Sequence, residues 1–309
     1  MFPSFRPRWP ITGITGIVLF LVCVTGCDTG VDVLQPSDEF RFSLFGALDV
    51  AKDTQVVRVE PIGDTTRIGA PEEIDAQVVL ENLDTGTQVS MRDSFATVGG
   101  GIGQVHNFWT THSLRPGTSY QIRVEEEGTA VTTATTTTPE QPPELVHAPD
   151  STDDRAFRLP CRLDNRGEPL EIQNTFSFRV FGASSVAAVK VLYTIDRAGQ
   201  DRPVTRQFDW LERVRKRTND PGFRIPVFYG RDLATLKQRG RGCLARSQFA
   251  RPFARATVTA GGPDWPDWGG ASLNDLARPD TFSNVSGGHG FVGGVYTDTV
   301  RIPIQVRED

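Results

Sequence analysis

The 309-residue sequence has few of the residues that metal, redox and catalytic sites use most: four cysteines, four histidines and two methionines. The histidines are His106, His112, His147 and His289, and no His-Glu-x-x-His, Cys-x-x-Cys or EF-hand pattern occurs. The sequence therefore gives no signal for a zinc or calcium site. It also has no Gly-x-Ser-x-Gly elbow for a nucleophilic serine. We expect no metal, no cofactor, no catalytic residue and no enzymatic activity.

The sequence also has no apolar run of the length that a membrane span needs. The most apolar run covers only fourteen residues, from Ile11 to Val24, and threonine and glycine interrupt it. A transmembrane helix needs about 20 apolar residues. Arg6 and Arg8 precede the run, and no acidic residue does. A basic start followed by a short apolar region is typical of a secretory signal peptide.

The end of this run, Val24-Thr25-Gly26-Cys27, resembles the bacterial lipobox, in which a signal peptidase cuts before a cysteine that then receives acyl chains. The resemblance implies a signal peptide over residues 1–26, lipidation of Cys27 and a polar tether over residues 27–38. The alternative is an ordinary signal peptide in which Cys27 is incidental. We expect a protein held to a membrane of the cell envelope by its N-terminal lipid, at the outer rather than the inner membrane. Export also argues against nucleic acid as a partner.

Two cysteines remain if Cys23 leaves with the signal peptide and Cys27 carries lipid. These are Cys161 and Cys243. In an oxidising envelope compartment such a pair predicts one disulfide. The alternative is two separate buried thiols.

The rest of the chain has the period-two alternation of half-buried strands. Strands are predicted for EFRFSLFGALD, TQVVRVEPI, QVHNFWTTH, SYQIRVEEE and TAVTTATTTT in the first half. The segment DAQVVLENLDTGTQVSM predicts a hairpin whose Gly86 takes the left-handed conformation. TFSFRVFG, AAVKVLYTID, FARATVTA and VYTDTVRIPIQV predict further strands in the second half.

The segment LRPGTSYQIRV resembles the turn and following strand of fibronectin-type and immunoglobulin-like modules. The resemblance implies that the hydroxyl of Tyr120 bonds to the backbone a few residues upstream. We expect a mainly β protein: an immunoglobulin-like antiparallel sandwich over residues 39–139, a linker over 140–155, and a β-rich domain over 156–309. One or two short helices are expected in the second domain, at FDWLERVRKR (208–217) and at DLATLKQRG (232–240), with Asp232 capping the latter.

Charge is unevenly distributed along the chain, although the net charge is only −5. Residues 28–139 contain 17 acidic and 7 basic residues, whereas residues 202–255 contain 14 basic and 4 acidic ones. This asymmetry has three interpretations: docking between domains, a basic face turned to an anionic surface, or a solvated stretch whose arginines pair locally.

Two unusual stretches lie near the C-terminus. In PDWPDWGG, the pairs Asp264-Trp265 and Asp267-Trp268 predict a loop that binds sugar or peptide, because an indole stacks and a carboxylate orients. The alternative is that both indoles pack on the core of the second domain. The run GHGFVG (288–293) has the spacing of a dinucleotide motif, but a strand pattern follows it rather than a helix. We expect these glycines to allow close backbone approach.

Three parts of the chain together resemble a family of bacterial envelope lipoproteins that carry a domain of unknown function and are often encoded beside TonB-dependent outer-membrane receptors. They are the lipobox, the succession IDAQVVLENLDTG and LRPGTSYQIRVEEEGTAVTTATTTTP, and the closing SNVSGGHGFVGGVYTDTV. The resemblance implies a non-catalytic accessory binding subunit for an outer-membrane transport receptor or for its cargo. The alternative function is a structural or adhesive envelope module without a small-molecule site.

Overall fold

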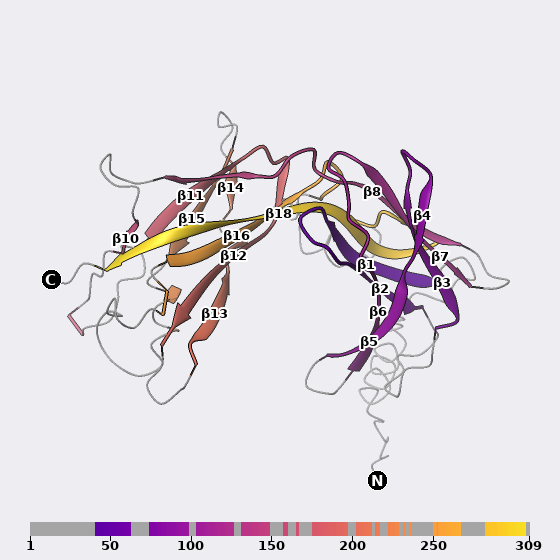
Figure 1. Cartoon of the computed structure of the whole chain (residues 1–309), viewed down its shortest axis with the longest axis horizontal. Helices are drawn as coiled ribbons and strands as arrows, with labels where there is room; N and C mark the ends of the chain where they lie inside the picture. Colours follow the sequence, from indigo (N-terminus) through magenta and orange to yellow (C-terminus); the bar gives the residue numbers. More distant parts are fainter. Residues whose placement is uncertain are drawn as a thin grey trace, which may run out of the picture. The chain divides into compact units, whose positions relative to one another are not determined.

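Alternating buried and exposed residues dominate the chain, as the sequence predicts, and the architecture is built from strands (Figure 1). The computed structural model describes residues 41–62, 74–98, 103–126, 131–148, 157–159, 165–166, 175–196, 202–211, 214–216, 222–228, 231–232, 235, 250–251, 253–266 and 282–306. Within these residues eighteen strands form three sheets of nine, five and four strands. The protein is therefore mainly β.

The first half of the chain forms a sandwich of two sheets. The order β1-β2-β6-β5 in one sheet opposes the order β8-β7-β3-β4 in the other. This is the strand order of an immunoglobulin-like sandwich with one added edge strand, β4. The strands are β1 (Phe42–Asp49), β2 (Gln55–Pro61), β3 (Ala76–Asn82), β4 (Thr87–Ser90), β5 (Arg92–Val98), β6 (Gly103–Thr110), β7 (Ser119–Glu126) and β8 (Thr132–Thr137).

The second half repeats this order. The sheet β9-β11-β15-β14 opposes the strands β13-β12-β16-β18, and β10 pairs in parallel with β18. Both halves are therefore immunoglobulin-like in topology, although the sequence shows no internal repeat. The strands are β9 (Glu144–Ala148), β10 (Phe157–Leu159), β11 (Thr175–Phe181), β12 (Ser185–Ile195), β13 (Val204–Asp209), β14 (Arg215–Lys216), β15 (Phe223–Phe228), β16 (Phe253–Gly261), β17 (Val285–Ser286) and β18 (Gly288–Val306).

One strand, β18, belongs to both sandwiches (Figure 1). Its first part, Gly288 to Val295, pairs in parallel with β1, and its second part, Val295 to Pro303, pairs antiparallel with β16. Even-numbered side chains of β18 supply both cores, since Val292 lies in the first core and Ile302 in the second. The side chains next to these two, Phe291 and Arg301, point to the opposite face. We call that face the outer face of the nine-stranded sheet.

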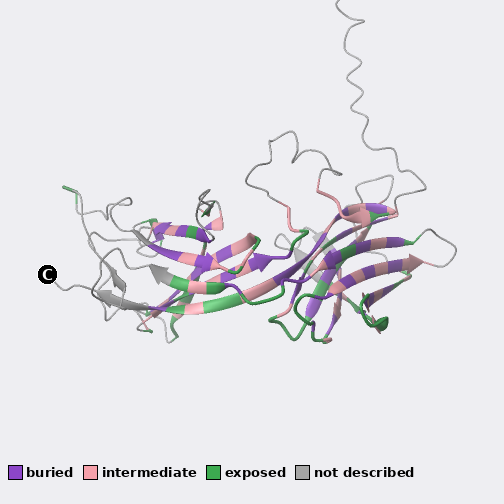
Figure 2. Ribbon diagram, turned by 90° about the horizontal axis from the view of Figure 1, so that it is seen from above, coloured by how far each residue is buried: buried purple, intermediate pink, exposed green. Residues whose placement is uncertain are grey.

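Each sandwich has its own apolar core, and the strands alternate between buried and exposed residues (Figure 2). Phe42 and Leu44 are buried in the first core, as their alternation predicts, and Phe178 and Val180 are buried in the second. Other buried members are Leu48, Val57, Val59, Leu80, Ile122 and Val124 in the first core, and Val189, Val191, Ile225, Val227 and Val258 in the second.

The glycines of β18 allow the close backbone approach that the sequence predicts. Gly290 has a φ of +113°, and a Cβ placed on it would lie 2.1 Å from the carbonyl oxygen of Leu44. A Cβ on Gly288 would lie 2.1 Å from the carbonyl oxygen of Phe42. Side chains at these positions would force β18 away from β1.

Side chains complete the hydrogen bonding of β18 where no strand lies beside it. The Asn284 amide accepts from Val292 N–H at 3.0 Å and donates to Val292 C=O at 2.8 Å, as a neighbouring strand would. The Gly294 N–H donates to Thr136 Oγ1 at 2.7 Å. These contacts attach β18 to the edge of the first sandwich near β8.

Asp49 holds β18 where it leaves β1. Its carboxylate is buried and accepts from the backbone N–H of Thr297 at 3.1 Å and from the Thr297 hydroxyl at 2.6 Å. It also accepts from the N–H of Ala51, and the Lys52 ammonium lies 3.3 Å away. A buried charge is tolerated here because several donors surround it.

Two local predictions in the first sandwich are confirmed. Gly86 has a φ of +69° in the turn between β3 and β4. The hydroxyl of buried Tyr120 accepts a hydrogen bond from the N–H of Arg115 at 2.8 Å, which is the upstream backbone bond that the sequence resemblance implies.

Neither predicted helix is seen among the elements that the described residues form. Residues 208–217 do not form a helix, because Phe208 lies in β13 and Arg215 lies in β14. The apolar spacing that suggested a helical face instead comes from a strand end and a turn. Residues 231, 232 and 235 have helical backbone conformation, but most of the predicted helix 232–240 lies outside the described residues. The Asp232 carboxyl is buried and accepts from the Tyr193 hydroxyl, and its predicted capping role stays a prediction.

Two strands pair across the predicted domain boundaries. Strand β9 lies within residues 140–155, which the sequence assigned to a linker, and it pairs with β11. Strand β18 lies in the predicted second domain but pairs with β1 of the first. The predicted division into domains over residues 39–139 and 156–309 stays a prediction.

Substitution of Gly290 tests how far the fold depends on the close approach of β18 to β1. We expect Gly290→Ala to lower the free energy of unfolding by at least about 3 kcal/mol, because backbone strain and a clash with Leu44 add together. The matched control is Gly86→Ala, whose Cβ would meet no atom within 4 Å. That variant should lose only about 1–2 kcal/mol, from its positive φ. Equal losses in urea unfolding would contradict the role given to Gly290.

Candidate functional site

Trp265 and Asp264 lie in the loop after β16 and pack against the strands on which the two sandwiches meet. The Trp265 ring covers Gly261 and Gly293, since a Cβ at either glycine would lie 2.4–2.5 Å from its atoms. It meets the ring of Phe291 edge-on at 5.3 Å. The carboxylate of Asp264 accepts from the backbone N–H of Thr137 at 2.9 Å. Trp265 is therefore half-buried on a glycine platform.

The other predicted site residues are not placed. Asp267 and Trp268 lie outside the described residues, so their part in the predicted loop site stays a prediction. Cys27, Cys161 and Cys243 also lie outside the described residues. Lipidation and the disulfide stay predictions.

Trp265 lies beside a group of apolar side chains on the outer face of the first sandwich. In register, Phe45 lies opposite Phe291, and Val56 lies opposite Trp109. Phe45 is 52 % exposed and Val56 is 43 % exposed. We call Phe45, Val56, Trp109, Trp265 and Phe291 the aromatic face.

Arginines border the aromatic face. The Arg92 guanidinium lies 5.4 Å from the centroid of the Trp109 ring, at cation–π distance. Arg58 lies opposite Phe45 and pairs with Glu60 at 3.0 Å. The face thus offers flat aromatic surface with fixed positive charge at its rim, a combination found where proteins bind partners.

Sequence reasoning missed most of this face. It assigned Phe42 and Leu44 to the buried side of β1 and did not consider Phe45, which interrupts the alternation. An aromatic residue on the polar side of a strand was the available signal. Trp109 and Phe291 gave no comparable signal, because their neighbours become known only with strand order.

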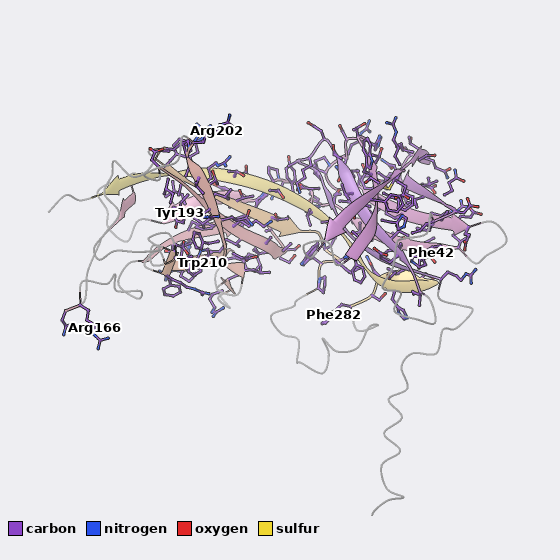
Figure 3. The ribbon with its side chains drawn as sticks, turned by 90° about the horizontal axis from the view of Figure 1, so that it is seen from below. Phe42, Arg166, Tyr193, Arg202, Trp210 and Phe282 are labelled. Carbon is purple, nitrogen blue, oxygen red and sulfur yellow. The ribbon has the colours of Figure 1, made fainter. Side chains whose placement is uncertain are left out.

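A buried carboxyl lies in the second core. Asp232 has no exposed surface, and its Oδ2 accepts a hydrogen bond from the Tyr193 hydroxyl at 2.8 Å. Tyr193 and Trp210, both buried, lie in the same sandwich (Figure 3). Asp232 Oδ1 and the indole nitrogen of Trp210 complete no hydrogen bond.

Burial raises the pKa of Asp232 from 3.8 to about 7. The hydroxyl of Tyr193, the nearby indole N–H of Trp210 and the charge of Arg231 lower the pKa, but desolvation outweighs them. Because this carboxyl has no contact with solvent, we assign it to the stability of the core rather than to chemistry.

A histidine–aspartate pair joins β5 to β6. His106 Nδ1 lies 2.9 Å from Asp93 Oδ2, and the imidazole packs against the Phe95 ring at 4.4 Å between centroids. Strand β6 ends at Thr110, so His112 does not lie in the same strand as His106.

The Ser184 hydroxyl donates to the carbonyl oxygen of Gly261 at 3.1 Å and therefore holds a loop to β16.

Neither a metal centre nor a membrane helix occurs in the part of the chain that the structure describes. No three histidine, cysteine or acidic side chains gather there as metal ligands would. No helix within the same residues has the length and apolar character to cross a bilayer.

Comparison with known proteins finds likeness among solved structures alone. No family model and no curated protein matches the chain. The chain is similar to the N-terminal Ig1-2 module of the Drosophila receptor protein tyrosine phosphatase DLAR, with 12 % identity, 86 % of this chain and 96 % of that chain covered, and a TM-score of 0.23. So low a score carries no argument. The immunoglobulin-like assignment follows from the strand order.

The buried carboxyl predicts how stability changes with pH. The folded chain holds the Asp232 proton more tightly than the unfolded chain, so this stabilisation is complete below about pH 4 and is lost as pH rises to about 7. Relative to Asp232→Asn, the parent should lose up to roughly 4 kcal/mol of unfolding free energy over that range. Urea unfolding of both proteins between these pH values measures the difference. Parallel profiles would refute the assignment.

Proposed function

We propose that this protein is a non-catalytic, lipid-anchored binding protein of the cell envelope. It would serve as an accessory subunit for an outer-membrane transport receptor or for the cargo of that receptor. Cys27 carries the lipid, and the aromatic face makes the contact. The lipobox and the family resemblance of the sequence support the anchor and the class of partner.

The observation that supports a binding role most directly is the exposure of the aromatic face. Apolar side chains on one sheet face mark an interaction surface when they are contiguous. Phe45 and Val56 are both more than two-fifths exposed, and Trp109 lies beside them. Trp and Arg are the residues that most often carry binding energy, and Arg92 stacks on Trp109.

The architecture suits such a role. Four of its five residues lie on regular strands, so these side chains are held in fixed positions before contact. The shared strand β18 contributes Phe291, and the loop after β16 contributes Trp265. The face is thus assembled from both ends of the chain.

Substitution of Cys27 tests the anchor. Cys27→Ser, produced with its signal peptide still processed, should leave the membrane fraction after a high-salt wash, because stable anchoring needs acyl chains. The parent should stay with the membranes. Retention of the serine variant at high salt would show that another segment holds the protein.

Site-specific photo-cross-linking tests the aromatic face. A photoreactive phenylalanine at Phe45 should cross-link in native membranes to a transport receptor or its cargo. The same group at Leu83, which is 42 % exposed in the turn after β3, is the matched control and should not. Phe45→Ser with Val56→Ser should change stability by no more than about 0.5 kcal/mol each and abolish capture. Equal cross-linking from both positions would count against the proposal.

A further inference from the structure

A cluster of arginines lies on the outer face of the second sandwich, where β16 pairs with β18. Arg255 and Arg301 lie directly opposite one another in register. The guanidinium of Arg301 lies 5.0 Å from the centroid of the Phe253 ring, and that of Arg251 lies 6.0 Å from it. We call Arg251, Phe253, Arg255 and Arg301 the arginine cluster.

This cluster points away from the core. Ala254 and Ala256 alternate with its β16 members and are buried in the second core, as is Ile302 on β18. All three arginines are exposed. Phe253 is half-buried, and the guanidinium groups of Arg251 and Arg301 both lie within cation–π distance of its ring.

The charges in the cluster are not balanced by the described part of the chain. Like charges directly opposite one another on neighbouring strands are destabilising. Among the described residues, no acidic side chain forms an ion pair with Arg251, Arg255 or Arg301. On β12, Leu192 lies opposite Arg255, and Lys190 lies two residues along on the same face, opposite Asp209 of β13. Asp196 follows the end of β12, which a hydrogen bond from Ala250 N–H to Thr194 C=O brings close to Arg251. The arrangement favours an external anion.

The chemistry of the cluster selects the kind of anion. A guanidinium group makes forked hydrogen bonds that match phosphate oxygens, and stacking on an aromatic ring presents the fork in a fixed plane. The cluster lies on the face of a sheet, and its one apolar residue is already covered by arginine. A protein partner would instead need an apolar centre depleted of charge. A planar surface of mobile phosphate groups fits better.

We propose that the arginine cluster docks on an anionic phospholipid surface through its phosphate groups. The proposal extends the proposed function and rests on its lipid anchor. Only thirteen residues separate Cys27 from Arg41, the first described residue, so the tether reaches at most about 50 Å. An anchored protein therefore stays close enough to the bilayer for repeated contact.

Vesicle binding tests the cluster without the acyl chains. The mature chain carrying Cys27→Ser is mixed at about 0.05 M salt with vesicles of phosphatidylcholine, pure or with about 30 % phosphatidylglycerol, and sedimented. We expect binding to the anionic vesicles only, and its loss at high salt. Arg255→Gln with Arg301→Gln should weaken it about thirtyfold, since two surface arginines contribute attraction of that order.

Two controls make the result specific. Arg41→Gln with Arg123→Gln removes the same charge from the first sandwich, where both arginines pair with glutamates, and should weaken binding much less. Phe45→Ser with Val56→Ser should leave binding intact. The proposal would be overturned if either control variant lost as much vesicle binding as the cluster variant, or if the cluster variant bound as the parent does. The cluster would then be a site for an acidic protein. Inorganic phosphate that displaces the protein from vesicles at millimolar concentration would overturn it in favour of a discrete phosphate site.

The outcome is independent of the anchor itself. Mass spectrometry of the parent protein reports whether Cys27 is acylated, whereas the vesicle assay uses a chain without lipid. A Cys27 without acyl chains would contradict the anchor in the proposed function. Absence of binding to anionic vesicles would contradict the proposal for the arginine cluster.

Discussion

Pairing along β18 is the constraint on which the rest of the structure depends. The backbone of β18 pairs with β1 in the first sandwich and with β16 in the second. One sheet of each sandwich therefore joins into a single sheet. This requires that β18 approach β1 more closely than side chains allow, which explains glycine at 288 and 290. It also requires acceptors for backbone N–H groups of β18 that no described strand satisfies. The side-chain oxygens of Asn284 and Asp49 accept from the N–H groups of Val292 and Thr297 there, from outside the strand.

Merging two sheets gives the protein one continuous outer face with two chemistries. Over the first sandwich this face is aromatic, around Phe45 and Trp109, and over the second it is cationic, around Arg255 and Arg301. The overall charge of the chain is negative, so the cationic part is a local property of strand order. Residues distant in sequence become neighbours only because β16 and β18 pair.

Local signals in the sequence predicted local structure well. The turn at Gly86 and the bond of Tyr120 each depend on a few neighbouring residues, and both are found. The helix predicted over 208–217 failed because spacing in a short segment cannot distinguish a helix from a strand followed by a turn. Trp265 was recognised from its sequence. The rest of the aromatic face was not, because Phe45 and its neighbours come together only through pairing between distant strands.

The parallel pairing of β1 with β18 has a consequence for the order of folding. Phe42 finds its partner Gly288 only after almost the entire chain has been made. Contacts so distant in sequence slow folding, because the entropy of closing the loop must be overcome first. Until then β1 is an open edge, able to pair with other chains. The nascent protein would thus need protection from aggregation until its last strand arrives, and the C-terminal segment acts as the closing step for the N-terminal sandwich.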